Sequence, residues 1–275
     1  MQGLHDFIPT DVKISYIQEL LGTGFDTLDF GSFVSHKTIP QMKDTAQVLD
    51  KLDLTGTSTR LLAIVANRRG AEEASAFEKI SYLGFPFSIS ETFQQRNTNS
   101  TIDESLSRVE EIQNICINTG KEMVVYISMA FGNPYGDTWG PEIGLTWSHR
   151  LSNELGVKII SLADTTGVSN PENISLMFGE LLPELSGVEV GAHLHSIPGQ
   201  VSGKLAAAFD AGCRRFDGAL RGFGGCPMAS DTLTGNMPTE VIKGWFEGHK
   251  IPTGLNEEKF QSVLLKSSTV FPPSI

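Results

Sequence analysis

Two histidines separated by a single residue are the chemically most informative feature of this sequence. They are His193 and His195, in the segment Gly191–His195. On an extended strand, residues two positions apart point to the same side, so both imidazoles would face one point. This arrangement is typical of a pair of metal ligands, although a histidine near a strand end can also serve only as a hydrogen-bonding group. The presence of two at this spacing favours a metal site.

A glycine-rich loop with one thiol follows the last apolar run. It extends from Gly222 to Ala229 and contains Cys226. The glycines permit a tight or mobile turn, and a thiol exposed there is a candidate acid, base or nucleophile; the alternative is a small apolar loop residue. Asn236 then precedes a proline-led helix. Its amide oxygen is a hard ligand suited to Mg²⁺ or Mn²⁺, although alone it would be interpreted as a helix cap.

Apolar, β-branched runs alternate with amphipathic segments along nearly the whole chain. The candidate strands are 27–30, 61–66, 86–90, 123–128, 158–162, 188–193 and 215–218. The candidate helices are 11–21, 42–52, 71–82, 103–119, 141–155, 171–185, 198–211, 238–247 and 257–264. A strand followed by a helix, repeated along the chain, predicts a parallel sheet with helical crossovers.

Polar residues gather at the carboxyl ends of these strands, where a (β/α)8 TIM barrel keeps its chemistry. They are Ser32, Glu91, Asp164, His193 and His195. The chain has no GxxxxGK[ST] motif and no GxGxxG after its first candidate strand, which argues against a nucleotide-binding open sheet. We therefore predict a TIM barrel. Only seven strands are recognisable and the first element is a helix, so we expect the first barrel strand to be missing from this chain.

The composition excludes several classes of protein. The chain has 275 residues, 40% of them hydrophobic and 19% charged, enough for a sizeable core. A net charge of −11 disfavours nucleic acid and anionic membranes. The three cysteines form no CxxC motif, which suits a reducing compartment, and neither a membrane-spanning run nor a signal-peptide pattern is recognisable. We expect one cytoplasmic domain over 1–275, with a C-terminal helix and tail from about residue 251.

Taken in order, the motifs resemble the hydroxymethylglutaryl-CoA lyase family of barrel metallolyases, over nearly the whole chain. The segments that carry the resemblance are Ser32–Ser35 with Ile39–Met42, Ser90–Glu91 with Asn97–Ser105, Ala130–Tyr135, Leu162–Val168, the HxH pair, the GGCP loop and Gly235–Asn236. The last three, in this order, form a specific combination.

The resemblance implies a metal-assisted retro-Claisen cleavage of 3-hydroxy-3-methylglutaryl-CoA, or a close 3-hydroxyacyl-CoA, to acetyl-CoA and acetoacetate. His193, His195 and Asn236 would bind the divalent cation, Mg²⁺ or Mn²⁺, and Cys226 would support proton transfer. The implied substrate-binding residues are Ser32, Asp29, Asp164 and Thr165. The implied partners are an acyl-CoA substrate and further copies of the chain, in a homodimer or higher homo-oligomer.

The N-terminus departs from the family pattern. The family's first strand ends in Arg-Asp, which supplies a fourth metal ligand and a cation for the enolate, whereas Met1–Gly3 resembles the continuation after it. We expect the natural chain to begin upstream, and this form to bind metal weakly and turn over slowly. The missing strand would expose edges at 27–30 and 215–218, so we expect partial repair by residues 1–10 or self-association.

Two alternative functions stay open on sequence alone. One is a Claisen-condensing acyltransferase or aldolase of the same superfamily, although only a short segment follows Ile251. The other is a barrel that has lost catalysis and serves in binding or assembly, which the missing Arg-Asp motif supports.

Overall fold

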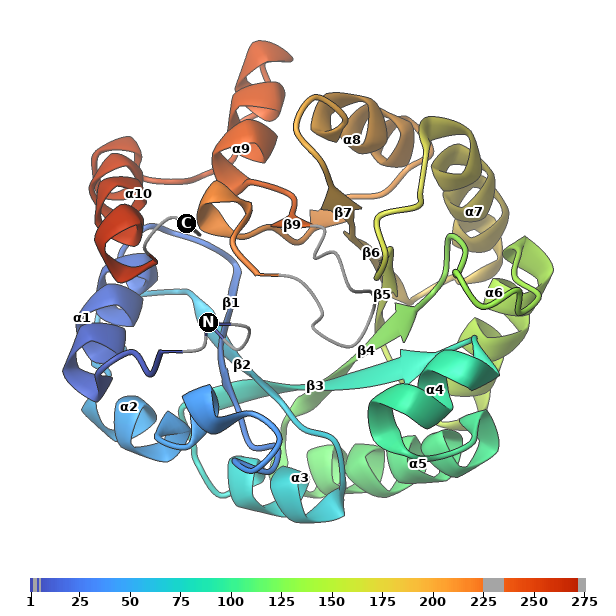
Figure 1. Ribbon diagram of the computed structural model, residues 1–275, viewed down its shortest axis with the longest axis horizontal. Coiled ribbons are helices and arrows are strands. Elements are labelled where there is room, and N and C mark those ends of the chain that lie inside the picture. The colour runs from blue at the N-terminus through green and yellow to red at the C-terminus, as the bar shows by residue number, and fades with distance from the viewer. Residues whose placement is uncertain (2–3, 5, 225–234, 272–275) are drawn as a thin grey trace.

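Seven parallel strands form a curled sheet in the computed structural model, which describes residues 1, 4, 6–224 and 235–271 (Figure 1). The strands are β1 (Thr27–Ser32), β2 (Arg60–Ile64), β3 (Ile80–Ser88), β4 (Glu122–Ser128), β5 (Ile159–Ala163), β6 (Glu189–His193) and β8 (Arg215–Phe216). They pair in chain order, and every pair is parallel. The predicted TIM-barrel fold is confirmed, and among the described residues no strand precedes the first helix.

Helices connect the strands and cover the outer side of the sheet (Figure 1). They are α1 (Thr10–Leu21), α2 (Thr45–Lys51), α3 (Arg68–Ser75), α4 (Glu91–Thr98), α5 (Ile102–Thr119), α6 (Pro141–His149), α7 (Pro171–Glu184), α8 (Val201–Asp210), α9 (Thr239–Gly248) and α10 (Glu257–Val270). Three short turns are η1 (Pro40–Met42), the π-helical η2 (Arg150–Glu154) and η3 (Leu220–Gly222). Two short strands, β7 (His195–Ser196) and β9 (Gly235–Asn236), pair antiparallel.

Side chains on each strand alternate between the helices and the inside of the curl, which we call the lumen. On β4, Val125 and Ile127 pack in the main core beneath the helices, whereas Val124 and Tyr126 join a separate cluster with Leu62. Residues opposite each other in a parallel pair face the same side of the sheet. The register of the pairs therefore shows, strand by strand, which residues face the helices and which face the lumen. The lumen side at the carboxyl ends of the strands is where polar groups would meet.

The two sheet edges, β1 and β8, are covered by helices. Helix α10 packs against α1 and closes the ring of helices (Figure 1). The apolar cluster between them consists of Ile8, Tyr16, Leu20, Leu220, Phe260, Val263, Val270 and Phe271. Each fully buried Leu or Phe side chain stabilises the fold by about 1.5–3 kcal/mol. A second apolar core thus joins α1 to α10.

The expected repair of the edge by residues 1–10 is not found as strand pairing in the described part of that segment. Gln41 fixes the segment instead, since its Oε1 accepts a hydrogen bond from the Ile8 amide at 2.8 Å. Its Nε2 donates to the Asp6 carbonyl at 2.7 Å. The chain is therefore anchored over η1 in an irregular conformation.

Helix α4 begins at a polar cluster that joins two loops of the barrel mouth. Ser90 caps the helix and donates its Oγ–H to Asp137 Oδ2 at 2.5 Å. The same carboxylate accepts from the Thr92 amide at 3.0 Å and the Thr92 hydroxyl at 2.9 Å. The hydrogen bond from Ser90, with those from Thr92, lowers the pKa of Asp137.

We predict that Asp137→Ala lowers the free energy of unfolding by about 1 kcal/mol at neutral pH, a typical cost of losing helix-cap hydrogen bonds. Because the pKa of Asp137 is lower in the fold than in the unfolded chain, its contribution is present above the ordinary pKa of about 4 and is lost as the pH falls through the folded value. Urea unfolding at a series of pH values measures this. Asp50→Ala, at an exposed carboxylate, is the control; an equal loss there contradicts the prediction.

Candidate active site

His193 ends strand β6 and is held by the carboxylate of Asp217, which directly follows the neighbouring strand β8. Its Nδ1 lies 3.1 Å from Asp217 Oδ2, and the same carboxylate accepts from the Ser161 hydroxyl at 3.3 Å. The edge of the Tyr126 ring packs against the imidazole, with centroids 5.4 Å apart. Asp217 thus fixes the ring orientation through Nδ1, which leaves Nε2 available for a ligand.

The charge of Asp217 sets the protonation of His193. Burial alone would lower the pKa of His193, but the hydrogen bond and negative charge of Asp217 outweigh it and raise the pKa. In return, although burial would raise the pKa of Asp217, its contact with His193 lowers it. The carboxylate therefore stays ionised beside the imidazole, the arrangement that commonly orients histidine ligands of metals.

His195 lies on β7, with its ring centroid 5.6 Å from that of His193. Its side chain is buried and contacts the Asn236 side chain and the Thr165 backbone. Burial lowers the pKa of His195 to about 3, and the neighbouring His193 adds to the effect. The ring is therefore neutral at physiological pH. Its Nδ1 is buried without a hydrogen-bond partner among the described residues, so one ring atom still requires a ligand or donor.

Asn236 stands opposite His195 in the β7–β9 pair. Its Nδ2 donates to the Phe223 carbonyl at 3.0 Å, which orients the amide. The preceding residue must be glycine, since a Cβ on Gly235 would lie 2.8 Å from the Gly222 carbonyl oxygen. The Gly235–Asn236 motif thus combines a close backbone contact with an amide placed beside the histidine pair.

Asp164 follows β5 and forms a buried ion pair with Lys204 of α8, at 3.0 Å between Oδ2 and Nζ. Oδ2 also accepts from the Ser169 hydroxyl at 2.5 Å and the Ser169 amide at 3.2 Å. Oδ1 is buried without a hydrogen-bond partner in the described part of the chain. Asp164 is therefore fixed by one oxygen and keeps the other for a ligand.

The other predicted residues divide between the lumen and a loop. Asp29 and Ser32 pair in register with Leu62 and Ile64 of the lumen cluster, so both face the lumen. The Ser32 hydroxyl accepts from the Val34 amide at 3.1 Å. Thr165 accepts from the Met129 amide at 3.3 Å through its hydroxyl, in addition to its backbone contact with His195.

Asp29 has an unusual pKa for a carboxyl group that water can reach. Partial removal from bulk solvent raises the pKa of Asp29 to about 7, and the charge of Asp217 adds to the rise. The Met1 amino group and His193 oppose it. The pKa of Asp29 therefore lies above the usual range of a carboxyl group.

Cys226 lies outside the described residues, and its predicted role stays a prediction. The two other cysteines, Cys116 and Cys213, are buried and unpaired, as predicted for core thiols.

Two residues of this cluster were missed from sequence. Asp217 follows β8 directly, and the rule that polar groups at strand ends carry the chemistry would have found it. Lys204 gave no such signal, because it lies inside an apolar helix segment.

The donor set fits a divalent cation. Two imidazole nitrogens and an amide oxygen are ligands that Mn²⁺ and related ions accept. The unpartnered Nδ1 of His195 and the carboxylate behind His193 both agree with metal ligation. No three His, Cys, Asp or Glu side chains gather as a metal site among the residues described. The predicted set contains only two such side chains, both histidines, since its third member is an amide.

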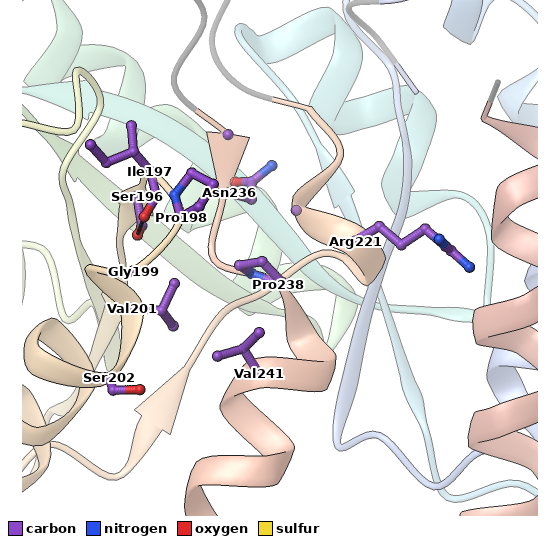
Figure 2. A pocket seen from close by; sticks show the side chains of 12 residues that line it. Ser196, Ile197, Pro198, Gly199, Val201, Ser202, Arg221, Asn236, Pro238 and Val241 are labelled. Carbon is purple, nitrogen blue, oxygen red and sulfur yellow. Dashed lines mark hydrogen bonds between the residues drawn. The ribbon is translucent and has the colours of Figure 1, made fainter. Parts of the chain in front are cut away.

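A cavity of about 440 Å³ lies beside the β7–β9 pair (Figure 2). Asn236, Pro238 and Val241 line one side, and Ile197 and Val201 line the other. Figure 2 shows Arg221 pointing away from these residues; its Nε donates to the Ser267 hydroxyl at 3.1 Å. Asn236 is the one predicted metal ligand among the described residues that line the cavity, so the cavity meets the candidate site at this amide.

Comparison with known proteins shows relatives over nearly the whole chain. The HMGL-like family model matches residues 1–265. The chain is 31% identical to 3-hydroxy-3-methylglutaryl-CoA lyase, cytoplasmic, of Rattus norvegicus, over 94% of this chain and 74% of that protein. It is 32% identical to a hydroxymethylglutaryl-CoA lyase of Bacillus subtilis, over 93% of this chain and 84% of that protein.

Solved structures show the same likeness. Hydroxymethylglutaryl-CoA lyase from Pseudomonas aeruginosa superposes with a TM-score of 0.91 at 27% identity, covering 99% of this chain and 90% of that one. An HMG-CoA lyase from Acenitobacter baumannii, in complex with coenzyme A and 3-methylmalate, gives 0.90 at 28% identity, covering 98% and 87%.

The barrel, the cluster at its mouth and these likenesses define a carbon–carbon lyase. The chain belongs to the HMGL-like family. Within the described residues, every helix is too short or too polar to cross a membrane.

Proposed function

We propose that the protein cleaves 3-hydroxy-3-methylglutaryl-CoA into acetyl-CoA and acetoacetate and that it needs Mg²⁺ or Mn²⁺. The observation that carries the proposal is the approach of His193, His195 and Asn236 at the mouth of a lyase barrel. The substrate is that for which the relatives are named, and the structural relative in complex with coenzyme A supports an acyl-CoA ligand.

The proposed metal ligands are His193, His195 and Asn236. When bound, the cation acts as a Lewis acid that polarises the tertiary hydroxyl and a carboxylate oxygen of the substrate. Asp217 orients the His193 ring, burial keeps His195 neutral, and the Phe223 carbonyl orients the Asn236 amide. Each residue is thus fixed before substrate binds, which lowers the entropic cost of reaching the reactive geometry.

The bond changes of this cleavage balance without an oxidant. A base takes the hydroxyl proton, the oxygen forms a carbonyl, and the adjacent carbon–carbon bond breaks. Its electron pair passes to the thioester enolate, which takes up a proton at carbon to give acetyl-CoA. We propose that Cys226 supplies this proton.

The substrate-binding residues are proposed to be Asp29, Ser32, Asp164 and Thr165. The hydroxyls of Ser32 and Thr165 accept backbone hydrogen bonds, so each keeps its own proton for donation. Asp164 keeps Oδ1 as an acceptor. Asp29, with its pKa near 7, can hold or release a proton in the lumen.

The test is product release by metal-free protein to which Mg²⁺ or Mn²⁺ is added back. We expect acetyl-CoA and acetoacetate to form only with the cation. Release of free thiol from acetyl-CoA plus a keto acid would show a condensing acyltransferase instead. Cleavage that proceeds unchanged in EDTA would contradict the proposed metal dependence.

Asp217→Asn is predicted to weaken Mn²⁺ binding by about 10- to 100-fold, the usual cost of removing a carboxylate behind a histidine ligand. The amide keeps the shape of the side chain but loses the charge that fixes the His193 ring. Calorimetric titration of the metal-free protein measures the affinity. Asp210→Asn, at an exposed carboxylate ending α8, should bind Mn²⁺ like the native protein; equal affinities for all three would refute the role of Asp217.

A further inference from the structure

A buried lysine contacts two of the segments that form the candidate site. Lys204 lies on the inner face of α8 with only 1% of its surface exposed. Its Nζ donates to Asp164 Oδ2 at 3.0 Å, to the His195 carbonyl at 2.7 Å and to the Gly167 carbonyl at 3.3 Å. An ammonium group has three donors, so all its hydrogen-bonding capacity is used inside the protein.

These contacts connect the loop after β5 with the strand that carries His195. Within the loop, Asp164 Oδ2 also accepts from Ser169, and the Gly167 amide donates to the Asp164 carbonyl at 3.2 Å. On the other side, the Asp164 amide donates to the His193 carbonyl at 3.0 Å. Lys204 is thus the side chain through which α8 holds the His195 backbone to the Asp164 loop.

Two buried atoms that have no hydrogen-bond partner among the described residues belong to side chains of residues that Lys204 contacts. They are Asp164 Oδ1 and His195 Nδ1. Burying a charged pair is costly unless the pair is well bonded, and a buried polar atom left open adds to that cost. Both the buried ion pair and the two buried atoms without partners lower the stability of the fold. Such a loss of stability is expected beside a candidate metal site, where these two atoms can bind a ligand.

We propose that Lys204 is a positioning residue, which holds the His195 backbone against the Asp164 loop so that the His195 ring is placed for a divalent cation. This inference rests on the proposed metal site. Lys204 itself touches neither cation nor substrate. Its charge is balanced by Asp164, so the pair adds no net charge to repel the metal.

The first test is Mn²⁺ binding to the metal-free 275-residue protein. The electron paramagnetic resonance signal of free Mn²⁺ measures how much of the ion stays unbound. Lys204→Met is expected to raise the dissociation constant by about 10- to 100-fold, as for other residues behind metal ligands. Lys204→Gln keeps two donors, so its Mn²⁺ dissociation constant should lie between those of Lys204→Met and the native protein. This variant also replaces Lys204→Met in the test if Lys204→Met folds poorly.

The matched control is Lys13→Met. Lys13 is also buried and also pairs with a carboxylate, that of Asp44 at 2.7 Å, and with the Gln41 carbonyl. Its loss should cost stability but leave Mn²⁺ affinity within about twofold. Native-like Mn²⁺ binding by both Lys204 variants, or equal weakening by Lys13→Met, overturns the proposal.

A second measurement needs no metal. Hydrogen exchange of the metal-free protein should show faster exchange of the Asp164, Gly167 and Ser169 amides in the Lys204 variants, but not in Lys13→Met. Unchanged protection of these amides also overturns the proposal. If the native protein binds no Mn²⁺, the proposed function fails, while the exchange data still decide whether Lys204 joins the two segments.

Discussion

His195→Ala is expected to lower kcat/KM for carbon–carbon cleavage by about 10³-fold or more. Its Mn²⁺ affinity should fall by more than the roughly 100-fold that is typical when a residue supporting a metal ligand is replaced. The histidine is buried and neutral, and its Nδ1 has no other partner in the described protein. Alanine leaves a hole that neither Asn236 nor His193 can fill. The variant then loses several kcal/mol of transition-state stabilisation that the bound cation would supply. Each loss of about 1.4 kcal/mol lowers the rate tenfold.

Steady-state kinetics at saturating Mn²⁺, together with calorimetric Mn²⁺ titration, measure this prediction. The control is His249→Ala, at an exposed histidine that stacks on Trp245 at the end of α9. That variant should keep the native rate and affinity. A His195→Ala protein that folds, binds Mn²⁺ and cleaves substrate at near the native rate would show that His195 is only a buried core histidine.

Asp164→Ala is expected to lower the free energy of unfolding by about 3–5 kcal/mol, the usual cost of removing one partner from a buried ion pair. The Lys204 ammonium would stay buried with only the carbonyls of His195 and Gly167 as partners. The Ser169 amide and hydroxyl would lose their acceptor as well. The loop after β5 would therefore be destabilised together with the fold.

Urea unfolding of five proteins tests this energy. They are the native chain, Asp164→Ala, and the closed cycle of Asp164→Leu, Lys204→Met and the double variant Asp164→Leu with Lys204→Met. The double variant should recover much of the stability, because an apolar pair of similar volume often replaces a buried ion pair at little cost. Additive losses in the double variant would contradict an energetic coupling between the two charges.

Much of the fold could be predicted from the sequence, because strands buried on both faces are continuous apolar runs between helix signals. The start of β3 was harder to predict from the sequence. The predicted helix 71–82 ends at Ser75, and Ile80–Tyr82 belong to β3 instead. These residues pair with both β2 and β4, and such pairing with distant segments leaves no local periodicity to detect.

Helix α4 was missed for a different reason. Its sequence is almost entirely polar, and only Phe93 and Gln94 are buried. The helix depends on its cap at Ser90 and on Asp137, which is supplied by a loop far along the chain. Contacts of this kind arise only in the folded protein.

In the candidate site, too, residues in local motifs could be identified from the sequence, whereas residues that reach the site from distant elements could not. The rings of His193 and His195 lie 5.6 Å apart, Asn236 stands opposite His195, and Asp29 and Ser32 face the lumen. The roles given to these residues from the resemblance stay predictions. The supporting residues come from other elements. Lys204 lies one turn inside α8. The apolar sequence of this helix gives no sign that its lysine contacts His195 on β7 and the Asp164 loop.

The most direct test of the proposed metal site is electron spin-echo spectroscopy of Mn²⁺ bound to the 275-residue protein, which detects nitrogen nuclei coordinated to the ion. We predict coupling to two histidine nitrogens in the native protein, and to one in either His193→Ala or His195→Ala wherever the ion still binds. Mn²⁺ that binds without nitrogen coupling, or with coupling that both substitutions leave unchanged, would contradict a metal site at the mouth of the barrel.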